Sequence, residues 1–322
     1  MPFTSIAGTG GYLPERVMEN KEFEALVNTS DEWIQERTGI KRRHIAAEDE
    51  TTSDMALAAA NRAIEGANID AQDIDLIIIA TTTGDKIFPS VACILQRRLG
   101  IRNMPAFDVH AACAGFVFGL DIADRFIRTE GATCALVVGA DIYSRIIDWS
   151  DRSTCVLFGD GAGAVILKAA EKPGILSTHI YADGAHEEML HVPAGISSGF
   201  DTVRSQEAFI KMKGNEVFKK AVSTLGAIAL ETLAANNLDK HDLTWLVPHQ
   251  ANLRIIKAAA KKLDLPLERT IITVDEHANT SSASIPLALD VAVRDGRIKR
   301  GDLLLLEGFG AGFTWGSALV RF

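Results

Sequence analysis

A cysteine, a histidine and an asparagine, far apart in the chain, each follow a short apolar run that predicts a buried strand. Cys113, His249 and Asn279 lie at the tips of three such runs. A cysteine thiolate is a strong nucleophile, and an imidazole and a carboxamide are polar groups that can act beside it. These residue types in equivalent positions indicate covalent chemistry at the sulfur of Cys113, provided that the fold brings the three turns together.

Cys113 stands in the segment AACAGF, where a strand gives way to an apolar helix. At the first turn of a helix a thiol meets free backbone N–H groups and the positive end of the helix dipole, and both favour the thiolate. We therefore expect a lowered thiol pKa, since a free cysteine with a pKa near ~8.5 is only a few per cent ionised at neutral pH. The alternative is a buried packing thiol, which is our interpretation of Cys93, Cys134 and Cys155.

The other two candidates have structural alternatives as well. Pro248 cannot donate a hydrogen bond to a sheet, so it ends its strand and leaves His249 at the tip. A lone histidine is more often a surface residue than a catalytic one. Asn279, in the segment NTSSAS, has the alternative of a helix cap or turn residue, a frequent position for asparagine.

Short apolar runs alternate with longer helical patterns along the chain, which is typical of an α/β protein with a mixed or parallel sheet. The predicted strands are residues 75–80, 106–109, 135–139, 163–167, 244–247, 271–274, 303–307 and 316–322. The predicted helices are residues 53–65, 90–99, 113–129, 215–236, 251–263 and 284–294.

The order of these elements repeats. Asp75 precedes Cys113 by 38 residues, and Asp242 precedes Asn279 by 37. This spacing predicts a duplicated unit, with residues 1–174 carrying the cysteine and residues 175–322 carrying the histidine and asparagine. The halves differ by an insertion of about 15 residues within 141–158 of the first half. Because ligands of such sheets bind beyond the carboxyl ends of strands, we expect one active site between the halves.

Composition excludes several classes of function. The chain has 322 residues, 47% of them apolar, and 33 Lys and Arg against 42 Asp and Glu give a net charge of −9. Nucleic acid is therefore not an expected partner. No basic segment with an apolar core opens the chain, and no apolar run reaches 18 residues, so neither a signal peptide nor a membrane span is predicted. The four cysteines form no CxxC pair, which favours reduced thiols in the cytoplasm over a zinc site or disulfides.

The segments around the three candidates resemble those of the β-ketoacyl-acyl-carrier-protein synthase III family. The resemblance rests on AACAGF at Cys113, PHQAN at His249 and NTSSAS at Asn279. It extends over essentially the whole chain, through residues 29–34, 37–40, 158–163 and 312–317. The implied fold is α/β and thiolase-like, with duplicated βαβαβ halves in a five-layered α-β-α-β-α arrangement.

The resemblance also implies the chemistry. Cys113 would take a short acyl group, with acetyl the expected one, from acyl-CoA. Malonyl-acyl-carrier protein would then lose CO₂ and condense with the acyl-cysteine to initiate fatty-acid synthesis. His249 and Asn279 would donate to one oxyanion, and the backbone N–H groups of Cys113 and Ala311 to another. The implied protein is a cytoplasmic homodimer that uses acyl-CoA as a substrate and needs neither a metal nor a permanently bound cofactor.

Further residues match the substrate-binding positions of the family. The CoA positions, which include a Trp and an Arg with the adenine stacked between them (Trp33 and Arg152), match Thr29, Trp33, Arg37, Arg152, Met212, Gly214, Phe218 and Asn252. The acyl-pocket positions match Phe88, Ile142 and Phe309, with Phe88 reaching in from the second subunit. The carrier-protein positions match Gln250, Ala251, Asn252, Leu253, Arg254, Lys257 and Lys219.

The carrier-protein surface also has support from the residues themselves. Arg254, Lys257 and Lys261 recur at i, i+3 and i+7 and so share one face of the predicted helix. On a protein of net charge −9, a basic stripe beside the active site suits an acidic partner. The alternative is a solvated helix face whose cations complement the helix dipole.

Two other functions remain open at this stage. One is an acyltransferase of the same fold without decarboxylative condensation, and the other is a non-catalytic subunit that binds acyl-carrier protein. The segment 195–199 matches G-x-S-x-G, but it lacks the strand and helix that a serine hydrolase requires. The sequence leaves the primer range, any feedback regulation and the roles of His110 and His277 undetermined.

Overall fold

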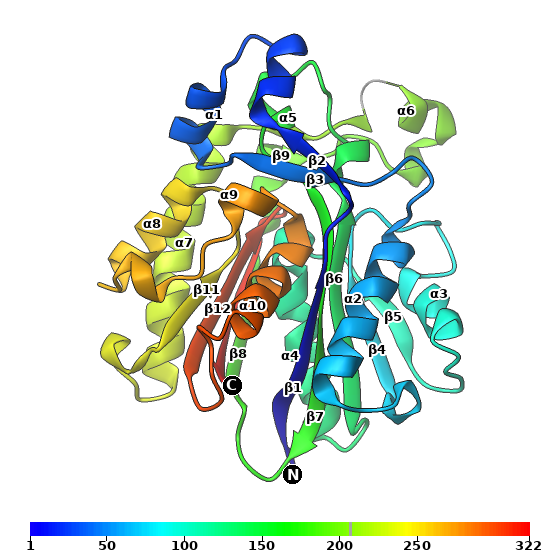
Figure 1. Cartoon of the computed structure of the whole chain (residues 1–322), viewed down its shortest axis with the longest axis vertical. Helices are drawn as coiled ribbons and strands as arrows, with labels where there is room; N and C mark the ends of the chain where they lie inside the picture. Colours follow the sequence, from blue (N-terminus) through cyan, green and yellow to red (C-terminus); the bar gives the residue numbers. More distant parts are fainter. Residues whose placement is uncertain (206–207) are drawn as a thin grey trace.

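Two β-sheets form the framework of the computed structural model, which describes residues 1–205 and 208–322 (Figure 1). The first has the order β1-β7-β6-β4-β5 and the second β11-β12-β13-β8. The first sheet comprises β1 (Phe3–Tyr12), β4 (Leu76–Ala80), β5 (Ala106–Val109), β6 (Cys134–Ile142) and β7 (Asp160–Ala170). The second comprises β8 (Ile175–Ala182), β11 (Trp245–Pro248), β12 (Leu303–Gly310) and β13 (Thr314–Arg321).

Three helix layers alternate with the two sheets. The outer layer of the first sheet is α2 (Thr52–Ala67) with α3 (Val91–Arg98), and that of the second is α7 (Gly214–Ala235) with α8 (Leu253–Lys262). Between the sheets lie α4 (Gly115–Arg128) and α10 (Ser284–Arg294). The five-layered thiolase-like fold is therefore confirmed.

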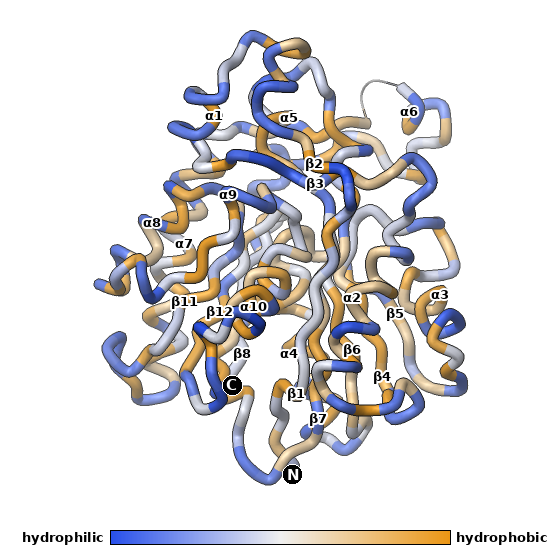
Figure 2. Tube along the Cα trace, viewed as in Figure 1, coloured by the Kyte–Doolittle hydropathy of each residue, from blue (hydrophilic) through white to orange (hydrophobic). Residues whose placement is uncertain are grey.

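The central layer forms because its two helices are apolar enough to be buried on both sides. Phe116 and Leu120 of α4 and Leu289 of α10 are fully buried, together with Val137 of the first sheet and Leu306 of the second. Hydrophobic residues follow the strands of both sheets (Figure 2). Burial of large apolar side chains at about 25 cal/mol per Å² holds the two halves against each other.

A smaller cap covers one end of the two sheets (Figure 1). This is the end at which β5, before Cys113, and β11, before His249, terminate. Its core includes Phe23 and Ile34 from the N-terminal region and Cys155 and Phe158 from the insertion between β6 and β7. The cap elements are β2 (Arg16–Glu19), α1 (Asp31–Thr38), β3 (Arg42–Ile45), α5 (Arg152–Cys155), β9 (Leu190–His191), α6 (Phe200–Arg204), β10 (Lys211–Met212) and α9 (Val274–His277).

Most of the predicted elements are confirmed, with ends that shift by a few residues, and one is wrong. Residues 271–274 form no strand: only a single bridge joins Leu246 to Thr270, and Val274 begins α9. The side chain of Gln250 replaces the missing strand partner, because its Oε1 accepts from the N–H groups of Thr273 and Val274. The structure also contains β1 and β8, which the alternation of apolar runs did not predict.

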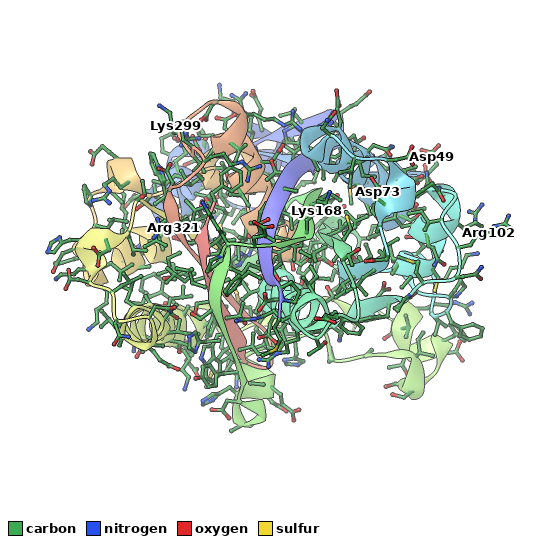
Figure 3. All side chains as sticks on the ribbon, turned by 90° about the horizontal axis from the view of Figure 1, so that it is seen from below. Asp49, Asp73, Arg102, Lys168, Lys299 and Arg321 are labelled. Atoms are coloured by element: carbon green, nitrogen blue, oxygen red, sulfur yellow. The ribbon has the colours of Figure 1, made fainter. Side chains whose placement is uncertain are left out.

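Charged side chains lie at the rim of the molecule, as Lys299, Asp49 and Arg102 illustrate (Figure 3). Over residues 1–205 and 208–322, no helix is both long and apolar enough to cross a membrane.

Candidate active site

Cys113, His249 and Asn279 line one pocket with a cavity volume of about 1290 Å³. Cys113 lies in the 3-10 turn Ala112–Ala114, His249 follows β11, and Asn279 follows α9. The three residues are 5%, 4% and 7% exposed, so the fold holds all of them out of bulk water. The turns that carry them belong to both halves of the duplicated chain.

The Cys113 turn sits tightly against the end of β12. A Cβ atom at Gly310 would lie 2.7 Å from the backbone nitrogen of Cys113, so only glycine permits this approach. Ala112 has a φ of 44° and Ala278 a φ of 58°, so the residue before Cys113 and the residue before Asn279 are both left-handed. Such conformations cost a non-glycine residue roughly 1–2 kcal/mol and concentrate at functional sites.

The prediction of a lowered pKa for the Cys113 thiol is wrong for the pocket without bound substrate. Burial raises the pKa of the thiol to about 12, and the nearby Asp141 carboxylate raises it further. The residue lies one position before Ala114, the N-cap of α4, rather than inside the first turn of that helix. The Ser281 hydroxyl, whose Oγ lies 3.5 Å from the sulfur, lowers the pKa because it can donate to the thiolate, and so partly offsets the effect of burial.

His249 is held by its backbone and its ring. Its N–H donates to the carbonyl of Glu307 at 2.8 Å, which extends the parallel pairing of β11 with β12 by one residue. Its Nδ1 lies 2.6 Å from Ser284 Oγ at the start of α10. Burial lowers the pKa of His249 to about 3, so the imidazole is neutral near pH 7.

The amide of Asn279 is oriented by its own loop. Its Oδ1 accepts from the backbone N–H of Ser281 at 2.9 Å, and its Nδ2 hydrogens have no acceptor in the part of the chain that the structure describes, so they can donate to a substrate. Its backbone pairs with the residues on either side of Phe158, through bonds to the carbonyl of Leu157 and from the N–H of Gly159. Asn279 therefore presents N–H donors, as the neutral His249 ring does.

Asp141, which has 0% exposure, joins the two halves behind the pocket. Its carboxylate accepts from the N–H and hydroxyl of Ser282 in the Asn279 loop, and from Thr82 and Thr83 after β4. A Cβ at Gly139 would come within 2.2 Å of the Ser282 carbonyl, so glycine is needed for this contact. The carboxylate thus fixes the position of the Asn279 loop.

Most of the predicted CoA-binding residues line the same pocket. Arg152 lies over the ring of Trp33, with its Cζ 4.7 Å from the ring centroid, and Arg37 lies 5.9 Å from the same centroid. Asn252 bonds to the carbonyl of Arg37, which ties the start of α8 to α1. The residues of this set that line the pocket are Trp33, Arg37, Arg152, Met212, Gly214, Phe218 and Asn252, whereas Thr29 does not.

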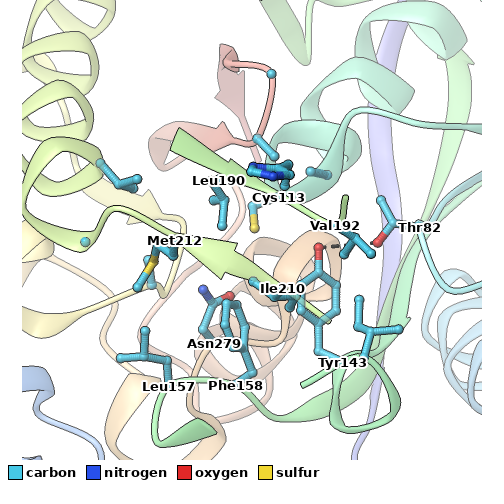
Figure 4. Close-up of a pocket in the computed structure, with 18 of the residues that line it drawn as sticks. Thr82, Cys113, Tyr143, Leu157, Phe158, Leu190, Val192, Ile210, Met212 and Asn279 are labelled. Carbon is cyan, nitrogen blue, oxygen red and sulfur yellow. Dashed lines mark hydrogen bonds between the residues drawn. The ribbon is translucent and has the colours of Figure 1, made fainter. Parts of the chain in front are cut away.

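The predicted acyl pocket needs revision. Phe309 lines the pocket and packs against Phe313, with ring centroids 4.7 Å apart. Ile142 does not line it, because its side chain points from β6 into the core beneath α2. Tyr143, the next residue, lines the pocket instead (Figure 4). Phe88 is 82% exposed and lies outside the lining of this chain's pocket.

The predicted carrier-protein surface is exposed in part. Arg254, Lys257 and Lys219 are exposed, and Arg254 lies over the Phe218 ring at 5.2 Å. Ala251 and Leu253 are half-buried. Gln250 does not belong to this surface: it is 0% exposed, and its amide bonds hold residues 271–274.

The sequence prediction missed several polar residues of the site. Ser281 and Ser284 stand inside the NTSSAS segment, and Asp141 and Tyr143 follow the apolar run of β6. The serine hydroxyl groups beside Asn279 in the sequence could have indicated further polar residues of the site. Among the described residues, no cluster of three His, Cys, Asp or Glu is arranged to hold a metal ion.

The five-layered fold, with a thiol in a pocket shared by its two halves, defines a thiolase-like acyltransferase. Residues 107–184 match the family model of 3-oxoacyl-[acyl-carrier-protein] synthase III, and residues 233–322 match the model of its C-terminal part. The chain is 63% identical over 322 residues to beta-ketoacyl-[acyl-carrier-protein] synthase III of Thioalkalivibrio sulfidiphilus, with 100% of both chains covered. It is 60% identical over 320 residues to that of Xanthomonas campestris pv. campestris, covering 99% of this chain and 98% of the relative.

A solved structure gives the same result. The crystal structure of 3-oxoacyl-[acyl-carrier-protein] synthase III from Aquifex aeolicus superposes with a TM-score of 0.93 at 46% identity, covering 99% of this chain and 100% of the other. The chain therefore belongs to the β-ketoacyl-acyl-carrier-protein synthase III family, the condensing acyltransferases that initiate fatty-acid synthesis.

Proposed function

We propose that the chain condenses a short acyl group from acyl-CoA with malonyl-acyl-carrier protein, through an acyl-Cys113 intermediate and with loss of CO₂. The observation that carries this proposal is the meeting of Cys113, His249 and Asn279 in one pocket from three distant segments. Nothing in the packing of the two halves requires a thiol, an imidazole and a carboxamide at this point. Acyl-CoA is a substrate, and the reaction needs no permanently bound cofactor.

In the first step the sulfur of Cys113 attacks the acyl-CoA thioester carbon. A bond forms between that carbon and the Cys113 sulfur, the bond to the CoA sulfur breaks, and the thiol proton passes to the departing CoA. The backbone N–H groups of Cys113 and Ala311 stabilise the negative charge on the thioester oxygen. Gly310 supports this role, because its missing side chain lets the 310–312 turn approach the backbone of Cys113.

In the second step malonyl-acyl-carrier protein loses CO₂, and negative charge develops on its thioester oxygen. The neutral His249 and the Nδ2 hydrogens of Asn279 donate to that oxygen. The resulting carbanion attacks the acyl carbon, the bond to the Cys113 sulfur breaks, and the sulfur leaves as a thiolate that takes up a proton from solvent to restore the thiol. Neutral donors suit this step because they lower the energy of the enolate without protonating its carbon, and each is worth about 10²–10³ in rate.

The primer is proposed to be acetyl or another short acyl group. Tyr143 and Phe309 are both bulky and buried, and both line the pocket. The active unit is proposed to be a cytoplasmic homodimer. Ile87 and Phe88 are 59% and 82% exposed, and a second copy of the chain would cover this apolar pair.

The test uses labelled acetyl-CoA with malonyl-acyl-carrier protein. We expect label on Cys113 by peptide mass spectrometry, followed by acetoacetyl-acyl-carrier protein. Cys113→Ser should abolish labelling, whereas His249→Ala and Asn279→Ala should retain labelling and lose CO₂ release. Labelling without condensation in the unaltered chain would favour an acyltransferase that does not condense, and neither event would favour a binding subunit.

A further inference from the structure

A row of three hydroxyl groups, from Ser281, Tyr143 and Thr82, lies between the sulfur of Cys113 and the buried carboxylate of Asp141. The sulfur lies 3.5 Å from Ser281 Oγ, and the Ser281 side chain lowers the pKa of the nearby Tyr143 hydroxyl, against the larger raising effect of burial. The hydroxyl oxygens of Tyr143 and Thr82 are 3.3 Å apart, and the Thr82 oxygen lies 3.1 Å from Asp141 Oδ1, so the single Thr82 proton serves one of these two contacts. The catalytic roles described above use none of these hydroxyls.

Packing and backbone conformation hold this row of hydroxyl groups in place. Tyr143 is buried against Phe158, with ring centroids 5.0 Å apart, and the Tyr143 hydroxyl points to Thr82 (Figure 4). Ser281 has a φ of 51°, a backbone conformation that a non-glycine residue adopts only when the surroundings impose it. Asp141 holds both ends of the arrangement, through Thr82 and through Ser282 next to Ser281.

We propose that the hydroxyl groups of Ser281 and Tyr143 stabilise the thiolate of Cys113 during catalysis. In the resting site the thiol donates to Ser281 Oγ. When the thiol loses its proton, to the departing CoA sulfur during acyl transfer or to solvent during alkylation, the Ser281 hydroxyl turns to donate to the sulfur anion, and Tyr143 donates to Ser281 Oγ. Ser281 is then a catalytic residue and Tyr143 a positioning residue that acts through it. The inference rests on the proposed role of Cys113 as nucleophile.

The groups around the Cys113 sulfur disfavour a thiolate, so a hydrogen-bond donor to the sulfur would be needed to stabilise it. Several titratable groups lie near Cys113. His110, Tyr143 and His249 line the same pocket, Asp141 acts on the pKa of the thiol, and Glu307 belongs to β12, which packs against the Cys113 turn. Asp141 opposes a second negative charge nearby. Burial keeps His249 neutral and the pKa of Tyr143 well above its usual value, so the Tyr143 hydroxyl retains the proton that it donates.

The test is the rate of Cys113 alkylation by iodoacetamide across pH ~7–9.5, read as modification of the Cys113 peptide by mass spectrometry. Ser281→Ala should slow alkylation about tenfold at every pH, equivalent to a thiol pKa about one unit higher. Tyr143→Phe should slow it by about twofold to threefold, because it weakens only the donor to Ser281. Thr280→Val is the matched control, since the Thr280 hydroxyl is buried in the same loop without a partner among the described residues.

Unchanged rates in both Ser281→Ala and Tyr143→Phe, or equal slowing by Thr280→Val, would overturn the inference. If Ser281→Ala does not fold, Tyr143→Phe alone decides, because it keeps the shape of the ring. The outcome is separable from that of the proposed function. If the alkylation rate does not depend on Ser281 or Tyr143, acyl labelling of Cys113 can still occur. If Cys113 is not acylated, the effect of the two hydroxyl groups on alkylation can still be measured.

Discussion

Nδ1 of His249 lies 2.6 Å from the hydroxyl oxygen of Ser284, a residue on the first turn of α10. The same oxygen accepts a hydrogen bond from the backbone N–H of Gln250 at 3.2 Å. A Ser284 hydroxyl that donates its own proton in turn makes His249 Nδ1 the acceptor. We infer that the neutral imidazole carries its proton on Nε2, where it can serve as a donor to the substrate.

Ser284→Ala removes the group that selects this form of the ring. We expect CO₂ release and condensation to fall about tenfold, because part of the His249 population would then carry its proton on Nδ1. Transfer of an acetyl group to Cys113 should stay within about twofold of the unaltered rate, since that step does not use the imidazole as a donor. Both rates are measured on the same preparation. An equal loss of both would show that the substitution disturbs the whole site.

The facing pair of Trp33 and Arg152 predicts recognition of the CoA nucleotide. Each of Trp33→Ala and Arg152→Ala should raise KM for acetyl-CoA about tenfold and leave kcat unchanged, because an indole and a guanidinium both stack on a purine. If both side chains contact the same adenine ring, KM of the double variant should rise by less than the product of the two single-variant increases.

A truncated thioester, acetyl-N-acetylcysteamine, is the control because it has no adenine. Its KM should be the same for all three variants and the unaltered chain. A rise in that KM would mean that Trp33 and Arg152 shape the pocket rather than bind the nucleotide.

The sequence predicted the central elements of the fold well, because their periodicity is strong. Cys113 follows Asp75 by 38 residues and Asn279 follows Asp242 by 37, so the two candidates have nearly the same spacing in both halves. Such a repeat, together with an apolar α4, is enough to predict two packed halves and a shared site.

Features that depend on contacts between distant residues were not predictable in this way. Residues 271–274 read as a strand, yet Gln250, 21 or more positions earlier, takes up their backbone hydrogen bonds. The pKa of Cys113 depends on burial and on Asp141, which no local motif reports. Ile142, the last residue of β6, faces the core, whereas Tyr143, the first residue of the following 3-10 turn, lines the pocket, so a prediction that is wrong by one residue chooses the wrong side chain.

The exposed cations beside the pocket predict how the acyl-carrier protein docks. Arg254→Glu and Lys257→Glu should each raise KM for malonyl-acyl-carrier protein about tenfold, because they replace attraction of an acidic partner with repulsion. The effect should shrink as salt increases. For Lys257→Glu, which lies outside the pocket lining, it should be absent with malonyl-CoA. Lys299→Glu is the control, since it makes the same change of charge at the rim of the molecule. If Lys299→Glu raises KM equally, only the net charge of the protein matters.

Glu307 gives the stability of the protein a predictable pH dependence. Its side chain is 0% exposed, and neither carboxyl oxygen has a hydrogen-bond partner among the described residues. Burial raises the pKa of Glu307 from 4.5 to about 8. Between these two values the folded chain keeps a proton that the unfolded chain releases, so this group makes folding less favourable as the pH rises through the window.

Glu307→Gln removes the ionisation while keeping the size of the side chain. Relative to the unaltered chain, the variant should gain stability between pH ~5 and ~8, by on the order of 1.4 kcal/mol for each pH unit of the window. The measurement is the midpoint of urea unfolding at both pH values, with the exposed Glu268→Gln as control. His249 and His277, whose pKa values are lowered by burial, give the opposite trend in both proteins and cancel in the comparison. A difference between variant and unaltered chain that is the same at both pH values would mean that the Glu307 carboxyl ionises as freely in the folded protein as in the unfolded one.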